Sequence, residues 1–206
     1  MITPDRPWQH CSADYKGPIA GKYYFHVLMD NHSRWPEVAM TTSTGMDKLK
    51  NILSDSFNIH GVPETITHDN GPLYNGREWQ AFAREQGFKP KACSPEHPES
   101  NGIEERFLSV LVKVIHAAVA EGKDPRLEVK KRLLNYRNML HPSMEASPVS
   151  LMMGREIRTK LPVMMKKPMT KAHVNARSRD EETRQKHKAR ANKDKRAKDK
   201  VYTKGD

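Results

Sequence analysis

Three carboxylates lie in local contexts that suit metal-dependent chemistry at phosphorus. They are Asp14 in WQHCSADYKG, Asp69 in TITHDNGP and Glu105 in SNGIEERF, and 35 residues separate the last two. Mg²⁺ and Mn²⁺ prefer hard oxygen ligands, and two such ions can activate an attacking oxygen and stabilise a leaving oxygen. The three residues therefore predict a divalent-metal site, provided that the fold brings their side chains together.

Each carboxylate also has a simpler interpretation. Asp14 could cap a turn at the end of a strand, and the Asp-Asn-Gly run that begins at Asp69 is an ordinary turn sequence. Glu104 and Glu105 are neighbours, so a helix would point them about 100° apart, and both flank its apolar stripe. The residues alone do not choose between these two glutamates.

Apolar periodicity predicts the elements that position these side chains. Strands are expected over residues 7–15, 22–30, 35–40, 65–68 and 89–93. Helices are expected from 46 to before 61, around 79–83, from about 100 onward, over 125–139 and from 147 to 154. Strands followed by alternating helices and strands are typical of an α/β layer with a mixed sheet.

Alternation along the first strand assigns its side chains to two faces. Asp14 would share one face with Trp8, His10 and Ser12, while Cys11 and Ala13 would point the other way. The short strand before Asp69 would deliver that residue at its C-terminal end.

The charge of the chain is concentrated at its C-terminal end. The net charge of the 206 residues is +11, yet residues 161–206 hold 15 Lys and Arg against 6 Asp and Glu, and the rest holds 21 against 19. We therefore expect a nearly neutral domain over 1–163 and a basic, extended or helical tail over 164–206 that binds a polyanion. A solubilising or nuclear-import segment would have the same composition.

Several classes of protein are disfavoured by what the sequence contains. Cys11 and Cys93 are single and far apart, which supports neither a disulfide framework nor a cysteine-based zinc site. No apolar run approaches the roughly 20 residues of a membrane span. A soluble intracellular protein without a membrane partner is expected.

Five ordered blocks give the chain a specific resemblance. PWQHCSADYKGP, MDNHSRWPEVAM, HGVPETITHDNGPLY, SPEHPESNGIEERF and HPSMEASPVSLMMGREIRTKLP cover roughly residues 5–163. The chain resembles the catalytic core of a retroviral-type integrase, most closely the gypsy-type branch of LTR retrotransposons. The resemblance implies an RNase H-like fold in which Asp14, Asp69 and Glu105 are catalytic. The family places its glutamate three residues after the glycine of its NGxxE motif, and counting from Gly102 selects Glu105.

The resemblance also implies chemistry and partners. Two Mg²⁺ or Mn²⁺ ions would be bound by the three carboxylates for removal of nucleotides from the 3′ ends of element DNA and for strand transfer into target DNA. The protein would act in the nucleus after cytoplasmic synthesis, as a homo-oligomer, with its tail leading toward a further C-terminal domain. The residues expected to contact DNA are His97, Asn101, Arg106, Lys113, Lys166, Lys167, Arg177 and Arg179.

Two neighbouring residues are expected to act structurally. By resemblance Asp30 sits at a structural position, where it would hydrogen-bond the turn at residues 31–33. His68, beside Asp69, would have a structural or substrate-side role because hard-metal chemistry favours oxygen ligands over imidazole.

The helix after Glu105 departs from the family pattern. Gypsy-type integrases usually read ERFNRTLKK here, whereas Ser109, Val110 and Val112 replace an Arg, a Thr and a Lys in this chain. The departure leaves two alternatives open. One is a domesticated, catalytically silent DNA-binding or scaffolding protein, and the other is a metal-dependent nuclease of the same fold.

The charge distribution predicts which segment supplies non-specific DNA affinity. Truncation after Val163 should weaken DNA binding and flatten its salt dependence together, since the log–log slope on duplex DNA is about −0.9 per phosphate neutralised. The truncated protein should keep its fold, because the tail has no apolar face. Binding titrations at several salt concentrations test this, and an unchanged slope would instead assign DNA contact to the surface around Arg106 and Lys113.

Overall fold

A computed structural model of the chain describes residues 4–69, 71–93, 102–141 and 144–159. The chain divides into two units, Met1–Val163 and Met164–Asp206, and every described residue belongs to the first. The basic tail predicted over 164–206 thus lies outside the described residues. In the part of the chain that is described, no helix is long and apolar enough to cross a membrane.

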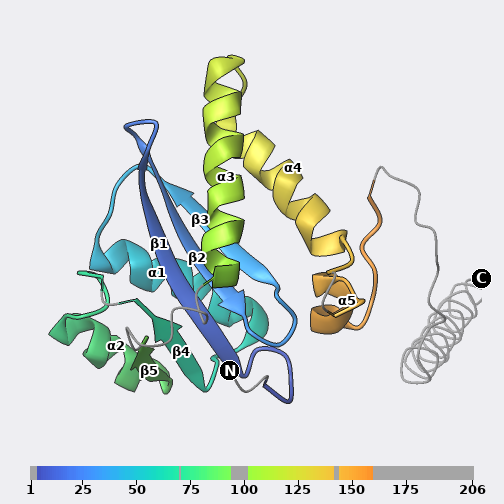
Figure 1. The fold of residues 1–206 in the computed structure, drawn as a ribbon. Helices are drawn as coiled ribbons and strands as arrows, with labels where there is room; N and C mark the ends of the chain where they lie inside the picture. Colours follow the sequence, from blue (N-terminus) through green and yellow to red (C-terminus); the bar gives the residue numbers. More distant parts are fainter. Residues whose placement is uncertain (1–3, 70, 94–101, 142–143, 160–206) are drawn as a thin grey trace, which may run out of the picture. The chain divides into compact units, whose positions relative to one another are not determined.

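The described strands form one mixed sheet in the order β3-β2-β1-β4-β5 (Figure 1). They are β1 (His10–Ile19), β2 (Tyr23–Asp30), β3 (Pro36–Thr41), β4 (Thr65–His68) and β5 (Lys89–Ala92). β1 pairs antiparallel with β2, and β2 with β3, whereas β4 runs parallel to β1 on one side and to β5 on the other. The prediction of an α/β fold with a mixed sheet is confirmed.

Helices cover both faces of this sheet. They are α1 (Met46–His60), α2 (Arg77–Gln86), α3 (Gly102–Ala120), α4 (Pro125–Asn138) and α5 (Pro148–Met153). Apolar side chains of α1 and α2 pack with Cys11, Ala13 and Ile66 in one core cluster. Those of α3 and α4 pack with Phe25 and Val27 in a second cluster, and Figure 1 shows α3 crossing the front of the sheet with α4 beside it.

Local capping residues set the ends of the C-terminal helices. The Asp124 carboxylate accepts a hydrogen bond from the backbone N–H of Arg126 (2.9 Å), one residue after the proline that begins α4. In α5 the Ser147 hydroxyl accepts from the Ser150 N–H, and the helix ends at Gly154 with φ 64°. The predicted bounds of this short helix are confirmed because its signals are contained in neighbouring residues.

The prediction of a strand starting at residue 7 is wrong. β1 begins at His10, and Trp8 has a left-handed backbone with φ 62°. Its N–H donates to Asp30 Oδ1 (3.0 Å) and its indole Nε1 donates to the Gly61 carbonyl (2.7 Å). Trp8 consequently packs in the cluster of Cys11 and Ala13 and does not share a face with Asp14, because these contacts override the strand alternation.

Asp30 has the structural role that was expected of it. Its side chain is fully buried and accepts hydrogen bonds from the N–H groups of Trp8, His32 and Ser33 and from the Ser33 hydroxyl. A buried carboxylate is tolerated when its oxygens are satisfied in this way. Asp30 therefore holds the segment before β1 and the turn after β2 together.

A half-buried carboxylate joins three elements. Glu37 of β3 lies 2.7 Å from Nε2 of His60 in α1, accepts from the Trp35 indole N–H (2.7 Å) and accepts from Arg137 of α4 (3.2 Å). The Arg137 guanidinium also lies 4.2 Å from the centre of the Trp35 ring. Burial alone would raise the pKa of the Glu37 carboxyl, but these hydrogen bonds and the Arg137 charge outweigh it and hold the pKa below its ordinary value.

Glu37→Gln should destabilise the domain and change its response to acid. A carboxyl whose pKa is lowered by folding contributes stability above its ordinary pKa of 4.5, and this contribution is lost as the pH falls through the lower folded value. We expect a loss of about 1–2 kcal/mol at pH 7 and a shallower loss of stability below about pH 4.5. Urea unfolding between pH 3 and 7 measures both effects, and parallel pH profiles for variant and wild type would contradict the assignment.

Candidate functional site

The two core clusters show which face of the sheet carries Asp14 and Asp69. Cys11 and Ala13 of β1 pack in the α1/α2 cluster, so alternation places Asp14 on the α3 face. Ile66 of β4 packs in the same α1/α2 cluster, so the same alternation places Asp69 on the α3 face too.

Strand register then brings these two carboxylates side by side. β1 and β4 are parallel, and their last paired residues are Ala13 and His68. The next residues along each chain are Asp14, which lies in the middle of β1, and Asp69, which directly follows β4. Neighbouring strands are about 4.8 Å apart. Both aspartates are half-buried, so each remains reachable by a ligand from the α3 side.

The negative charges of the two aspartates together affect the pKa of Tyr74. Its side chain is 2% exposed. Burial raises the pKa of the phenol first, and the negative charges of Asp14 and Asp69 raise the pKa further. Tyr74 therefore remains protonated, and its ring packs in the α1/α2 cluster against His68. The sequence does not predict this position for Tyr74, which stands there only as an aromatic residue three positions after Gly71.

Asp69 keeps one oxygen available although it also forms a turn. Its Oδ1 accepts the Gly71 N–H at 3.1 Å, and the described residues offer Oδ2 no hydrogen-bond donor. A Cβ added at Gly71 would lie 2.9 Å from Oδ1, so any other residue here would displace the Asp69 carboxylate. The turn interpretation and the ligand interpretation of Asp-Asn-Gly are thus compatible, because each uses a different oxygen.

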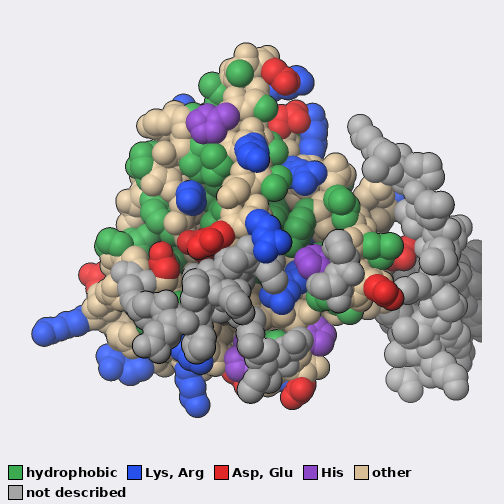
Figure 2. All heavy atoms as spheres, viewed as in Figure 1, with side chains coloured by type: hydrophobic (Ala, Val, Ile, Leu, Met, Phe, Trp, Pro, Cys, Tyr) green, Lys and Arg blue, Asp and Glu red, His purple; other side chains and the backbone are tan. Residues whose placement is uncertain are grey.

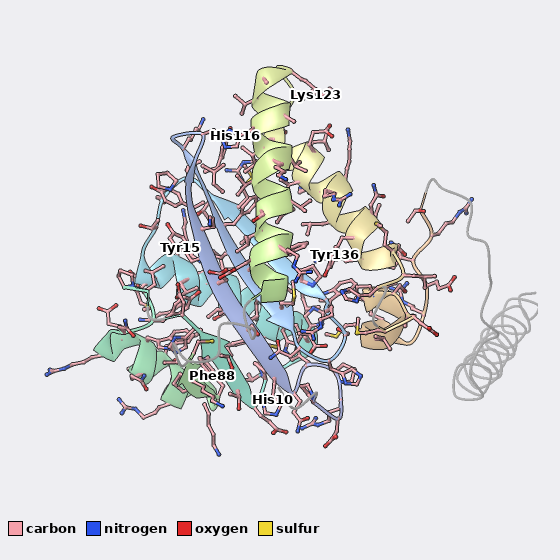
Figure 3. All side chains as sticks on the ribbon, viewed as in Figure 1. His10, Tyr15, Phe88, His116, Lys123 and Tyr136 are labelled. Carbon is pink, nitrogen blue, oxygen red and sulfur yellow. The ribbon has the colours of Figure 1, made fainter. Side chains whose placement is uncertain are left out.

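Asp14 and Glu105 approach the site from different elements. Asp14 Oδ1 accepts the N–H of Tyr15, the next residue on β1, at 2.7 Å, and Figure 3 labels Tyr15. Glu105 is exposed in the first turns of α3, just before Phe107 and Leu108, which are buried in the α3/α4 cluster. α3 contacts β1, and Figure 2 shows a small group of acidic side chains beside the N-terminal end of this helix.

Two of the three predicted metal ligands have the chemistry and the placement that a divalent cation requires. Asp14 and Asp69 supply hard carboxylate oxygens of the kind that Mg²⁺ and Mn²⁺ bind. Among the described side chains, however, no three His, Cys, Asp or Glu are grouped to hold a metal ion. The structure therefore aligns the aspartates and does not bring Glu105 into a three-ligand group with them.

Residues predicted to contact DNA fall into two sets. Arg106 and Lys113 are exposed on α3, and Figure 2 shows Lys and Arg side chains over the α3 and α4 face. Val112, one of the departures from the family pattern, packs against the α3/α4 cluster, so a lysine there would not simply extend this basic surface. The positions outside the described residues are His97, Asn101, Lys166, Lys167, Arg177 and Arg179.

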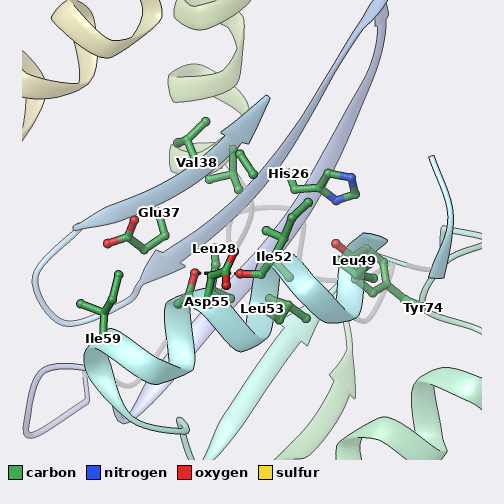
Figure 4. A pocket seen from close by; sticks show the side chains of 14 residues that line it. His26, Leu28, Glu37, Val38, Leu49, Ile52, Leu53, Asp55, Ile59 and Tyr74 are labelled. Carbon is green, nitrogen blue, oxygen red and sulfur yellow. Dashed lines mark hydrogen bonds between the residues drawn. The ribbon is translucent and has the colours of Figure 1, made fainter. Parts of the chain in front are cut away.

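A separate cavity of about 200 Å³ lies between α1 and the strands β2 and β3 (Figure 4). Its lining is largely apolar and includes Leu28, Ile52 and Leu53, with His26 and Tyr74 at one end. Burial lowers the pKa of His26 to about 4, with a smaller contribution from the charge of Lys48. The cavity lies on the α1 side of the sheet and is not the carboxylate site.

The sequence is similar to known proteins over most of its length. Residues 4–98 match the family model described as the integrase core domain. This stretch of the chain is similar to that family. The chain is 32% identical over 164 residues to an uncharacterized protein of Caenorhabditis elegans, and 28% identical over 159 residues to the Gag-Pol polyprotein of Walleye dermal sarcoma virus. These alignments span 79% and 76% of this chain but only 13% and 9% of the relatives.

Solved structures show the same fold at low sequence identity. A chain of the simian T-cell lymphotropic virus intasome matches with a TM-score of 0.66 at 18% identity, over 82% of this chain and 62% of that chain. The HTLV-2 integrase catalytic core domain in complex with magnesium matches with a TM-score of 0.60 at 16% identity, over 71% and 97%. The predicted RNase H-like architecture is confirmed by these two matches. The gypsy-type branch stays a prediction.

Metal binding should stabilise the wild-type protein and not its Asp69→Asn variant. A ligand present at ten times its Kd adds about 1.4 kcal/mol of stability to the protein that binds it. We expect Mg²⁺ to raise the wild-type Tm and EDTA to reverse the increase, while Asn at position 69 retains the turn and loses the charge. Asp47→Asn is a matched control, because the Asp47 carboxylate is 99% exposed. Equal Mg²⁺ responses in all three proteins would exclude Asp69 as a ligand.

Proposed function

We propose that this chain catalyses metal-dependent 3′-end processing and strand transfer of retrotransposon DNA of the gypsy type. The observation that carries the proposal is the alignment of Asp14 and Asp69 on one face of the parallel β1–β4 pair, in a chain whose residues 4–98 match the integrase core family. The magnesium complex of a structural relative supports the choice of metal. Members of this fold family are generally polynucleotidyl transferases.

The carboxylates act by holding and orienting the reacting groups. Asp14 and Asp69 would hold Mg²⁺ or Mn²⁺ from the sheet, and Glu105, which the described residues do not place in a three-ligand group, would join them from α3. When bound, two ions lower the pKa of the attacking oxygen and neutralise charge on the leaving oxygen. Rigid strands hold these groups, so the protein contributes mainly placement and electrostatics.

The DNA surface extends from the metal site along α3. Arg106 and Lys113 are exposed on this helix and supply positive charge near phosphates. The basic tail would add non-specific affinity, and the cellular site of the reaction would be the nucleus. Joining two DNA ends to one target requires a homo-oligomer, because one core contains one metal site.

A strand-transfer assay on oligonucleotide ends with a plasmid target distinguishes the candidate functions. Joined products that need Mg²⁺ or Mn²⁺ would support the proposal. Cleavage without joining would identify a nuclease of the same fold, and DNA binding with neither product would identify a silent scaffold. Asp14→Asn serves as the inactive control, since it retains the size of the side chain.

Glu105→Gln should abolish strand transfer, whereas Glu104→Gln should be nearly silent. Both substitutions conserve size and remove one charge, so only metal ligation distinguishes them. Loss of even a supporting partner of a metal ligand costs about 10–100-fold, so loss of the ligand itself should cost more than about 100-fold. Rates of product formation by the two variants measure the difference. Equal losses would mean that the glutamate counted from Gly102 is not the ligand.

A further inference from the structure

We propose that Trp79 and His68 form a hydrogen-bonded pair that positions Asp69 for metal binding. The Trp79 indole Nε1 lies 3.3 Å from His68 Nε2, and His68 Nδ1 lies 2.7 Å from the carbonyl oxygen of Asp69. Both side chains are almost fully buried, at 0% and 4% exposure. Neither is a metal ligand in the proposed function, on which this inference rests.

The partners of His68 define its tautomer. An indole N–H can only donate, so His68 Nε2 must accept and carries no proton. The proton therefore resides on Nδ1, which donates to the Asp69 carbonyl. A neutral imidazole with both nitrogens satisfied is the form that a buried site accommodates at low cost. Trp79 thus dictates which nitrogen of His68 faces the backbone of Asp69.

This arrangement restrains the backbone of Asp69 at two points. Its carbonyl accepts from His68, and its carboxylate accepts from the Gly71 N–H, two residues later in the chain. The imidazole itself is fixed between rings, since the Tyr74 ring stacks at 5.0 Å and the Trp79 ring meets it edge-on at 5.6 Å. His68 also anchors β5, because its carbonyl accepts from Cys93 N–H at 2.8 Å.

Fixing the backbone fixes the direction of the carboxylate. Asp69 follows the end of β4, so strand pairing alone does not restrain the peptide after it. A metal ligand must be held within about 0.5 Å of its productive position. Removing the restraint should therefore weaken metal binding about 10–100-fold, the usual effect of losing a group that orients a ligand. Catalysis at saturating metal should change much less.

Trp79→Phe tests the pair with a small change in packing. It retains an aromatic ring in the core and removes the one N–H that fixes His68. Trp35→Phe is the matched control, because the Trp35 indole also donates a single hydrogen bond, to Glu37 at 2.7 Å, and is also buried. Both variants should lose stability, and only Trp79→Phe should lose Mn²⁺ affinity. Mn²⁺ titrations by calorimetry and by electron paramagnetic resonance measure this without any DNA.

Substitutions of His68 provide the second test. His68→Asn places an amide nitrogen near the position of Nδ1 and can still donate to the Asp69 carbonyl, whereas His68→Ala cannot. Mn²⁺ affinity should fall by 10–100-fold in His68→Ala and recover partly in His68→Asn. Because Trp79 acts through His68, the double variant Trp79→Phe/His68→Ala should be no worse than His68→Ala alone. In strand-transfer assays, the metal concentration for half-maximal rate should rise while the rate at saturating metal stays near wild type.

Each outcome decides a separate question. If wild type binds Mn²⁺ and Trp79→Phe binds it as tightly as Trp35→Phe, the positioning role is overturned and the proposed function stands. Additive losses in the double variant would likewise overturn action through a single hydrogen-bonded pair. If wild type binds no Mn²⁺, the proposed function fails, and the positioning role fails with it.

Discussion

The parallel register of β1 with β4 is the constraint on which the proposed site depends. Pairing of Ala13 with His68 makes Asp14 and Asp69 successive neighbours, and alternation directs both to one face. A parallel pair requires a long connection, and α1 in this connection packs on the opposite face of the sheet. The carboxylate face is thus left for α3. A one-residue shift in register would turn one aspartate toward the core formed with α1 and α2.

The number of hydrogen-bond donors around each carboxylate separates the structural acids from the proposed metal ligand Asp69. Asp30 accepts four hydrogen bonds and is fully buried. Glu37 has partners from three side chains and joins α1, β3 and α4. The Asp69 carboxylate, in contrast, accepts one N–H and retains an oxygen that the described residues do not satisfy. Saturated acids hold the fold together, and an acid left incompletely satisfied beside a second one can bind a cation.

Packing explains part of the departure of α3 from the family pattern. Val112 packs against the cluster that joins α3 to α4, and the rings of Phe107 in α3 and Tyr136 in α4 lie tilted with their centres 4.6 Å apart, with Tyr136 labelled in Figure 3. Ser109 is exposed, so its replacement of a basic residue reduces charge on the solvent face. The helix therefore gains an apolar contact at Val112 and carries less positive charge at Ser109 than the family pattern. DNA affinity in this chain would then depend more on Arg106, Lys113 and the tail.

The sequence by itself determined the order and type of the described elements, the ends of α5 and the structural role of Asp30. Apolar periodicity, helix-capping residues and turn residues depend only on neighbouring positions in the sequence, so they can be identified without the tertiary structure. It also supplied three candidate carboxylates, yet only the tertiary structure aligned Asp14 with Asp69, because register depends on pairing between distant segments. Trp8 was misplaced for the same reason, since its conformation follows from contacts with Asp30 and Gly61. Tyr74 and Trp79 gained their roles only through packing against His68, which sequence spacing does not encode.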